Sequence, residues 1–159
     1  MASRVRDGGR LLRVYFPPLL RKGKSQAGHS RLLLAFPANL TFMKITRVSC
    51  MDEGASAFDE IEVELTEIGT LGSQSKPRAA SSIVFRETPS DYDSHWHQAP
   101  HRQYFVLLDG EIEIECGMSE KRRFRGGDIL LLEDTWGSGH RTRTTDGKTG
   151  RSIFIRLDA

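Results

Sequence analysis

Alternation of apolar and charged side chains along the chain predicts β-strands that each bury one face. In residues 60–65 and 111–116, glutamates alternate with isoleucine, valine, leucine or cysteine. Near the end of the chain, Ile153, Ile155 and Leu157 alternate with other side chains in the same way. Successive side chains of a strand point to opposite faces, so these runs are typical of half-buried strands.

Turn signals separate the runs. They fall at residues 69–76, 109–110, 117–120, 126–128, 136–139 and 146–147, all containing glycine. Short strands punctuated about every ten residues are typical of a β-sandwich or barrel, and no segment reads as a long helix. The sequence therefore predicts an all-β fold, a small barrel that begins near Met43.

Residues 1–42 have a different character. They carry a net charge of +7, whereas residues 43–159 carry −5, and they show no helical or strand period around Pro17-Pro18 and Pro37. Three interpretations stand side by side: a mitochondrial-type targeting segment, a disordered basic tail, or translated upstream sequence with Met43 as the working start. We expect a non-globular N-terminal extension, 1–42, followed by one folded domain, 43–159.

Composition excludes several classes of function. No apolar run approaches the roughly 18 residues that a membrane span needs, so no membrane partner is expected. The acidic body would repel a phosphate backbone, which argues against nucleic acid. Cys50 and Cys116 form neither a disulfide pattern nor a zinc motif, so a reducing compartment fits. We expect a cytoplasmic protein, or a mitochondrial one if the leader is a transit peptide.

Histidines supply the candidate chemistry. His95 and His97 form an H-x-H step, which on a strand would place both imidazoles on one face, as two ligands of one metal require. A further histidine, His140, follows a glycine-rich stretch downstream. Phe105 and Leu107 share the parity of Gln103 and would line a pocket with apolar surface.

Two stretches of this chain resemble the motifs of the cupin family. The first cupin motif is Gly, five residues, H-x-H, three or four residues, Glu, six residues, Gly. Here five residues separate the H-x-H step from Gln103 and six more separate Gln103 from Gly110, with Gln in place of Glu and Pro89 in place of the first Gly. The second motif is Gly, five residues, Pro-x-Gly, two residues, His, three residues, Asn; it is matched by the stretch from Gly127 to Thr144, with two extra residues, Thr135 for Pro and Thr144 for Asn.

Residues 99–104, APHRQY, and 133–140, EDTWGSGH, are also similar to stretches of a subgroup of small single-domain cupins. The resemblance implies a double-stranded β-helix, or jelly-roll barrel. Some fungal members of the subgroup sit beside polyketide pathways and are described as oxidoreductases, which suggests secondary metabolism. One fold hosts many chemistries, so function does not follow from the fold.

By this resemblance, the barrel interior would hold one divalent transition metal ion, Fe, Mn, Ni, Cu or Zn, through a histidine-rich ligand set: His95, His97, Gln103 and His140. The set carries no charge, so the ion would keep its full +2 and polarise an oxygen ligand strongly, while being retained less firmly. The expected pocket includes Phe105, Leu107, Thr142 and Trp136, the last as a lid or a packing plug. Glu133 and Asp134 could act as general bases, although a capping role is commoner for Asp134.

We therefore expect a metal-dependent enzyme of oxidoreductase or isomerase/dehydratase type, acting on a small oxygenated organic molecule, with no catalytic residue assigned. The alternative is a metal-free cupin that binds a small molecule as a sensor or carrier. Since cupins commonly dimerise, a homodimer is also expected.

Overall fold

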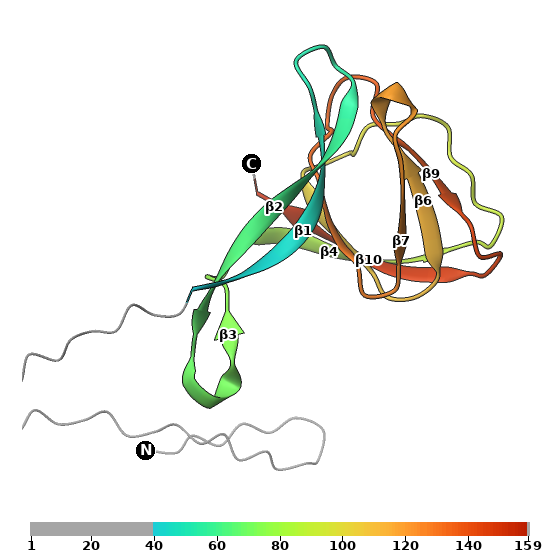
Figure 1. Ribbon diagram of the computed structural model, residues 1–159. Coiled ribbons are helices and arrows are strands. Elements are labelled where there is room, and N and C mark those ends of the chain that lie inside the picture. The colour runs from blue at the N-terminus through green and yellow to red at the C-terminus, as the bar shows by residue number, and fades with distance from the viewer. Residues whose placement is uncertain (1–39, 159) are drawn as a thin grey trace, which may run out of the picture. The chain divides into compact units, whose positions relative to one another are not determined.

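The computed structural model describes residues 40–158, which form two β-sheets facing each other (Figure 1). Seven strands in the order β3-β2-β1-β8-β5-β10-β4 make the larger sheet, and β7-β6-β9 make the smaller one. Their bounds are β1 Thr41–Cys50, β2 Ser56–Glu67, β3 Ser73–Gln74, β4 Ala80–Thr88, β5 Gln103–Leu107, β6 Glu111–Glu115, β7 Lys121–Arg125, β8 Ile129–Leu132, β9 Arg141–Thr144 and β10 Gly150–Leu157. The all-β prediction is confirmed.

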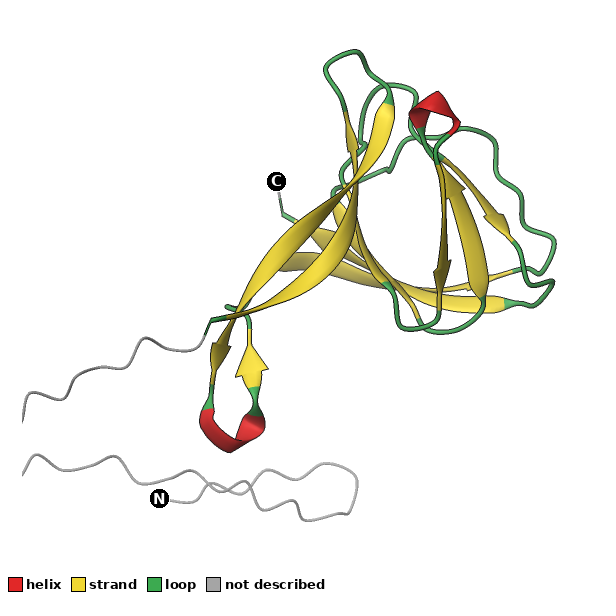
Figure 2. Ribbon diagram, viewed as in Figure 1, coloured by secondary structure: helices red, strands yellow, loops and turns green. Residues whose placement is uncertain are grey.

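Helix is almost absent from the described part of the chain. Two short 3₁₀ turns, η1 Gly69–Leu71 and η2 Gly117–Ser119, lie at the ends of hairpins (Figure 2). No helix among residues 40–158 is long and apolar enough to cross a membrane.

The first strand begins two residues before the predicted domain boundary. Thr41 and Phe42, which the prediction assigned to the leader, pair with Leu65 and Glu64 of β2. Phe42 and Met43 are neighbouring apolar residues, so alternation does not mark where this strand begins. Residues 1–39, the rest of the predicted extension, lie outside the described part of the chain.

The middle of the larger sheet supplies much of the interior. On β5, Gln103, Phe105 and Leu107 are buried while the residues between them are less so, as the alternation indicates. The ring of Phe105 packs against Phe154 of β10 with ring centroids 4.9 Å apart. The buried apolar cluster joins both sheets and comprises Val48, Phe58, Ala99, Phe105, Leu107, Ile112, Ile114, Cys116, Phe124, Leu130 and Leu132.

The predicted inward face of the last strand is wrong. Phe154 lies opposite Phe105, so Ser152, Phe154 and Arg156 share the inner face, and Ile153 and Ile155 lie on the outer one. The pattern misled because the inner face of β10 carries a serine and an arginine, whereas the outer face is apolar.

The outer face of the larger sheet ends at the edge strand β4, where Phe85 is 76% exposed and Ile83 is 58% exposed. Ile153 and Ile155 pair with these two residues. The homodimer expected from the sequence stays a prediction.

The smaller sheet holds a buried carboxylate on its outer face. Glu113 of β6 accepts hydrogen bonds from Arg143 at 2.6 Å and Arg123 at 3.3 Å. Burial would raise the pKa of Glu113, but the two guanidinium hydrogen bonds and charges outweigh burial and hold the pKa below its ordinary value.

Replacing this carboxylate should make stability less dependent on pH. A lowered pKa in the folded state means that Glu113 stabilises the fold above the ordinary carboxyl pKa, and that this contribution is lost as pH falls through the folded-state value. We expect Glu113→Gln to lower the melting temperature near neutral pH and to converge with wild type in acid, measured by thermal melts across pH. Glu62→Gln, the same charge change at an exposed site of β2, is the control. A difference that persists unchanged into acid would contradict the assignment.

Candidate functional site

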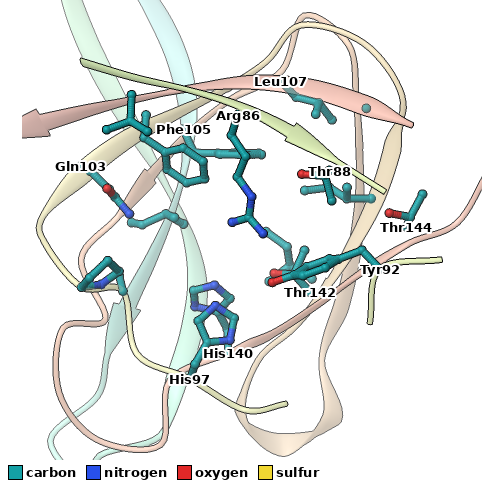
Figure 3. Close-up of a pocket in the computed structure, with 18 of the residues that line it drawn as sticks. Arg86, Thr88, Tyr92, His97, Gln103, Phe105, Leu107, His140, Thr142 and Thr144 are labelled. Atoms are coloured by element: carbon teal, nitrogen blue, oxygen red, sulfur yellow. The ribbon is translucent and has the colours of Figure 1, made fainter. Parts of the chain in front are cut away.

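A cavity of about 350 Å³ lies between the two sheets and receives side chains from both (Figure 3). Its size is at the lower end of the range typical of small-molecule sites, roughly 300–1,000 Å³. Apolar side chains from β5, β6, β8 and β10 form much of the wall: Phe105, Leu107, Ile112, Ile114, Leu132 and Phe154. The polar lining residues include Arg86, Thr88, Tyr92, His97, Gln103, His140, Thr142, Thr144 and Arg156.

His97 and His140 face each other at one side of this cavity. Their backbones form a two-residue antiparallel bridge, in which each N–H donates to the other's carbonyl at 2.9 Å. The ring centroids are 4.6 Å apart, and the rings are tilted by 54°. The bridge brings together the irregular segment between β4 and β5 and the residue that immediately precedes β9, so the two motif histidines meet although 42 positions separate them.

Gly139 makes this close approach feasible. Its φ is +69°, and a Cβ built there would lie 2.1 Å from the carbonyl oxygen of His97. Any other residue would be strained by the left-handed backbone and would also collide with the bridge. Gly139, which belongs to the second motif, is therefore needed for the backbone of His97, in the first motif, to come this close.

Hydrogen bonds fix the tautomers of both imidazoles. Nδ1 of His97 is 2.9 Å from the carbonyl oxygen of His95, and Nδ1 of His140 is 2.6 Å from Oδ2 of Asp134. A carbonyl oxygen and a carboxylate are both acceptors, so each Nδ1 carries the proton and donates it. Each neutral ring is left with its lone pair on Nε2, the atom that can bind a metal ion or accept a proton.

Asp134 is the acidic residue that belongs to this site. It is 0% exposed, its carbonyl accepts a hydrogen bond from Ala99, and its Oδ1 has no hydrogen-bond partner among the described residues. Glu133, the other acid considered from the sequence, instead forms ion pairs with Arg102 and Arg47. The buried carboxylate of Asp134 thus orients the His140 ring by accepting its Nδ1–H.

Several residues expected at the site line the cavity. Gln103 is 4% exposed and lies there with His97 and the 3% exposed His140. Phe105, Leu107 and Thr142 also line it.

The structure does not bring His95 to the cavity. Residues 94–97 do not form a strand; only His97 takes part in a bridge, so the alternation assumed for the H-x-H step does not apply. The side chain of His95 is exposed and is absent from the cavity lining. Its contribution is the backbone carbonyl that holds His97.

Trp136 is also misplaced by the prediction. Its side chain is 51% exposed and does not line the cavity. The loop that carries it is held near the β1–β2 turn, where Ser138 N–H donates to the carbonyl of Gly54 at 2.8 Å and Cys50 Sγ donates to the carbonyl of Trp136 at 2.6 Å. These contacts direct the tryptophan away from the cavity.

Sequence reasoning missed several polar groups of the cavity. Arg86 of β4 and Arg156 of β10 line it, together with Tyr92 from the connection after β4. Residues 83–85 are Ile-Val-Phe, so the apolar pattern of β4 does not show which face is inward. Tyr92 lies outside any strand, where alternation gives no signal.

No protein-family model matches this sequence, and no curated protein matches it significantly. Among solved structures, the chain is similar to the cupin domain of Cnp3 from Schizosaccharomyces pombe, with 12% identity over 76% of this chain and 85% of that chain and a TM-score of 0.42. It is also similar to a Cupin 2 conserved barrel domain protein from Salinispora arenicola, with 12% identity over 87% of this chain and 92% of that chain and a TM-score of 0.40.

The two sheets enclose the cavity as a small all-β barrel, and the two motif histidines meet at its wall. The candidate site is this cavity, with an imidazole pair on one side.

The close approach at Gly139 can be tested against a matched glycine. Gly147 has nearly the same φ, +67°, but no atom lies within 4 Å of a Cβ built there. We expect Gly147→Ala to cost about 1–3 kcal/mol of stability from backbone strain alone, and Gly139→Ala to cost more because the bridge must also open. Thermal or denaturant unfolding of both variants checks this. Equal losses would show that the bridge does not depend on Gly139.

Proposed function

We propose that the protein binds one divalent transition metal ion through His97, His140 and Gln103, and acts on a small oxygenated organic molecule held in the same cavity. The observation that supports this most directly is the imidazole pair. Both Nδ1 atoms are engaged by the protein, so two Nε2 lone pairs are available close together. In metal sites, a carboxylate frequently accepts a hydrogen bond from the other ring N–H of a metal-bound histidine.

The donor set fits a transition metal better than calcium or magnesium. Imidazole nitrogens suit Fe, Mn, Ni, Cu or Zn, and the side-chain amide of Gln103 can add an oxygen donor. Within residues 40–158 there is no group of three His, Cys, Asp or Glu side chains that could hold a metal ion. The third protein ligand would therefore be the amide of Gln103. When bound, an ion with these ligands would act as a Lewis acid toward a substrate oxygen.

The chain's own residues prepare the cavity for a small molecule. Asp134 holds the His140 ring by its Nδ1 proton, and the apolar wall around Phe105 and Leu107 limits the water in contact with a ligand. The hydroxyl groups of Tyr92 and Thr142, which line the cavity, offer hydrogen bonds to an oxygenated molecule.

The metal-free alternative has its own supporting observation. Among the described residues that line the cavity, two carry imidazoles once His95 is excluded, while the Asp134–His140 pair is complete without an ion. His140 Nε2 can accept a proton from a bound molecule, and Asp134 would stabilise the resulting imidazolium. In this case the protein would be a metal-free binder, a sensor or carrier, or a proton-transfer enzyme.

Metal content distinguishes the two proposals. Protein purified without an affinity histidine tag should contain a transition metal, or bind one on titration, with about one ion per chain. His97→Ala and His140→Ala should each abolish this binding, because each removes one of two nitrogen donors. His95→Ala should leave it unchanged. Elemental analysis of the four proteins provides the measurement.

Retention of a full equivalent of metal in both His97→Ala and His140→Ala would show that the ion is held elsewhere. Failure of the wild-type chain to bind any of the five metals would leave the metal-free alternative.

A further inference from the structure

Two arginines line the cavity, Arg86 and Arg156, and Glu111 is the one acidic residue among the described residues that line it. The carboxylate of Glu111 is already engaged: it accepts a hydrogen bond from Thr145 Oγ1 at 2.7 Å and lies 3.7 Å from Arg123. Asp134, the other carboxylate of the site, lies outside the lining and binds His140. Among residues 40–158, neither acid forms an ion pair with the two arginines.

Among residues 40–158, the side chain of Arg86 contacts aromatic rings and makes no hydrogen bond. Its side chain leaves the edge strand β4 and extends into the cavity, above Tyr92 (Figure 3). The guanidinium carbon lies 5.0 Å from the ring centroid of Tyr92 and 5.9 Å from that of Phe154. Contact with a ring face uses none of the five N–H donors of an arginine.

The described residues provide no acidic partner for Arg86. It takes part in none of the ion pairs found among residues 40–158, whereas Arg141 and Arg151, for example, each pair with an aspartate. A guanidinium that points into a cavity with free donors is a ready site for an anion.

Arg156 places a second positive group at the other side of Phe154. On β10 it pairs with Gln103 of β5, whereas Arg86 pairs with Ser152, and Phe154 lies between these positions on the same face. Nε of Arg156 is buried and has no hydrogen-bond partner among the described residues. The end of the cavity near Gln103 therefore offers a second unsatisfied N–H donor to an anionic or strongly polar group.

We infer that the natural ligand is a small organic acid with an apolar body, whose carboxylate binds Arg86. A planar carboxylate matches the guanidinium fork with two parallel hydrogen bonds, and the rings and aliphatic side chains of the wall suit a hydrocarbon or aromatic body. Phosphate fits less well, because phosphate sites usually gather backbone N–H groups, whereas the neighbours of Arg86 are the rings of Tyr92 and Phe154.

This inference rests on the proposed function to the extent that the cavity must hold a small molecule, but it requires no metal ion. Anion binding can therefore be measured on metal-stripped protein, separately from metal content.

Benzoate and benzamide make a matched pair of probes, since they share a ring and differ in charge. Calorimetric titration of the full chain, before and after treatment with a chelator, should show benzoate binding and weaker benzamide binding. Arg86→Gln should lower the benzoate affinity by about ten- to hundredfold, the loss expected for hydrogen bonds to a charged group, and leave benzamide nearly unchanged. Arg86→Lys, which keeps the charge but not the fork, should fall between.

Arg125→Gln is the control for a general charge effect. Arg125 is exposed on β7, does not line the cavity, and its removal changes the net charge equally. Arg86→Gln also removes the contacts with the rings of Tyr92 and Phe154, so the melting temperature of each variant is measured and affinities are compared at a temperature where all are folded.

Four outcomes would overturn the inference: no benzoate binding by the wild-type chain, equal affinity for benzoate and benzamide, an equal loss in Arg125→Gln, or displacement of benzoate by lower concentrations of inorganic phosphate. Metal analysis of the same samples keeps the two proposals apart. Metal without benzoate binding contradicts only the anion site, and benzoate binding without metal contradicts only the metal site.

Discussion

The reciprocal backbone hydrogen bonds between His97 and His140 are the constraint on which the site depends. They join an irregular connection to the start of β9, and a glycine at position 139 is needed for the backbones to come this close. The same bridge sets the two rings 4.6 Å apart. Asp134 then fixes the orientation of the His140 ring through its Nδ1 proton. The geometry of the imidazole pair therefore follows from the backbone bridge and from this side-chain hydrogen bond.

The electrostatics of the cavity favour a negatively charged ligand for two independent reasons. Arg86 and Arg156 supply positive charge at the cavity, and the acids of the site, Glu111 and Asp134, bind other residues. A metal ion held only by His97, His140 and Gln103 would keep its full charge and add to the attraction. Even without an ion, a carboxylate at Arg86 would stay favourable, because hydrogen bonds between a guanidinium and a carboxylate are assisted by both charges.

Alternation in the sequence predicted the fold and part of the site, and its failures have physical causes. On β5, one polar and two apolar residues share the inward face, so Gln103, Phe105 and Leu107 could be placed from the pattern. His95 and Trp136 lie in irregular segments, where side-chain parity has no meaning and tertiary hydrogen bonds decide direction. Arg86 was missed because the edge strand β4 carries apolar residues on both faces.

The most direct test of the account is the protonation of the two imidazoles in the cavity. Nitrogen-15 NMR of the histidine rings distinguishes the Nδ1–H from the Nε2–H tautomer and reports which nitrogen responds to added Zn²⁺. We expect the neutral rings of His97 and His140 both to be Nδ1–H tautomers, and Zn²⁺ to shift their Nε2 resonances while those of His95 stay in place. An Nε2–H tautomer at either ring, or a response confined to His95, would contradict the account.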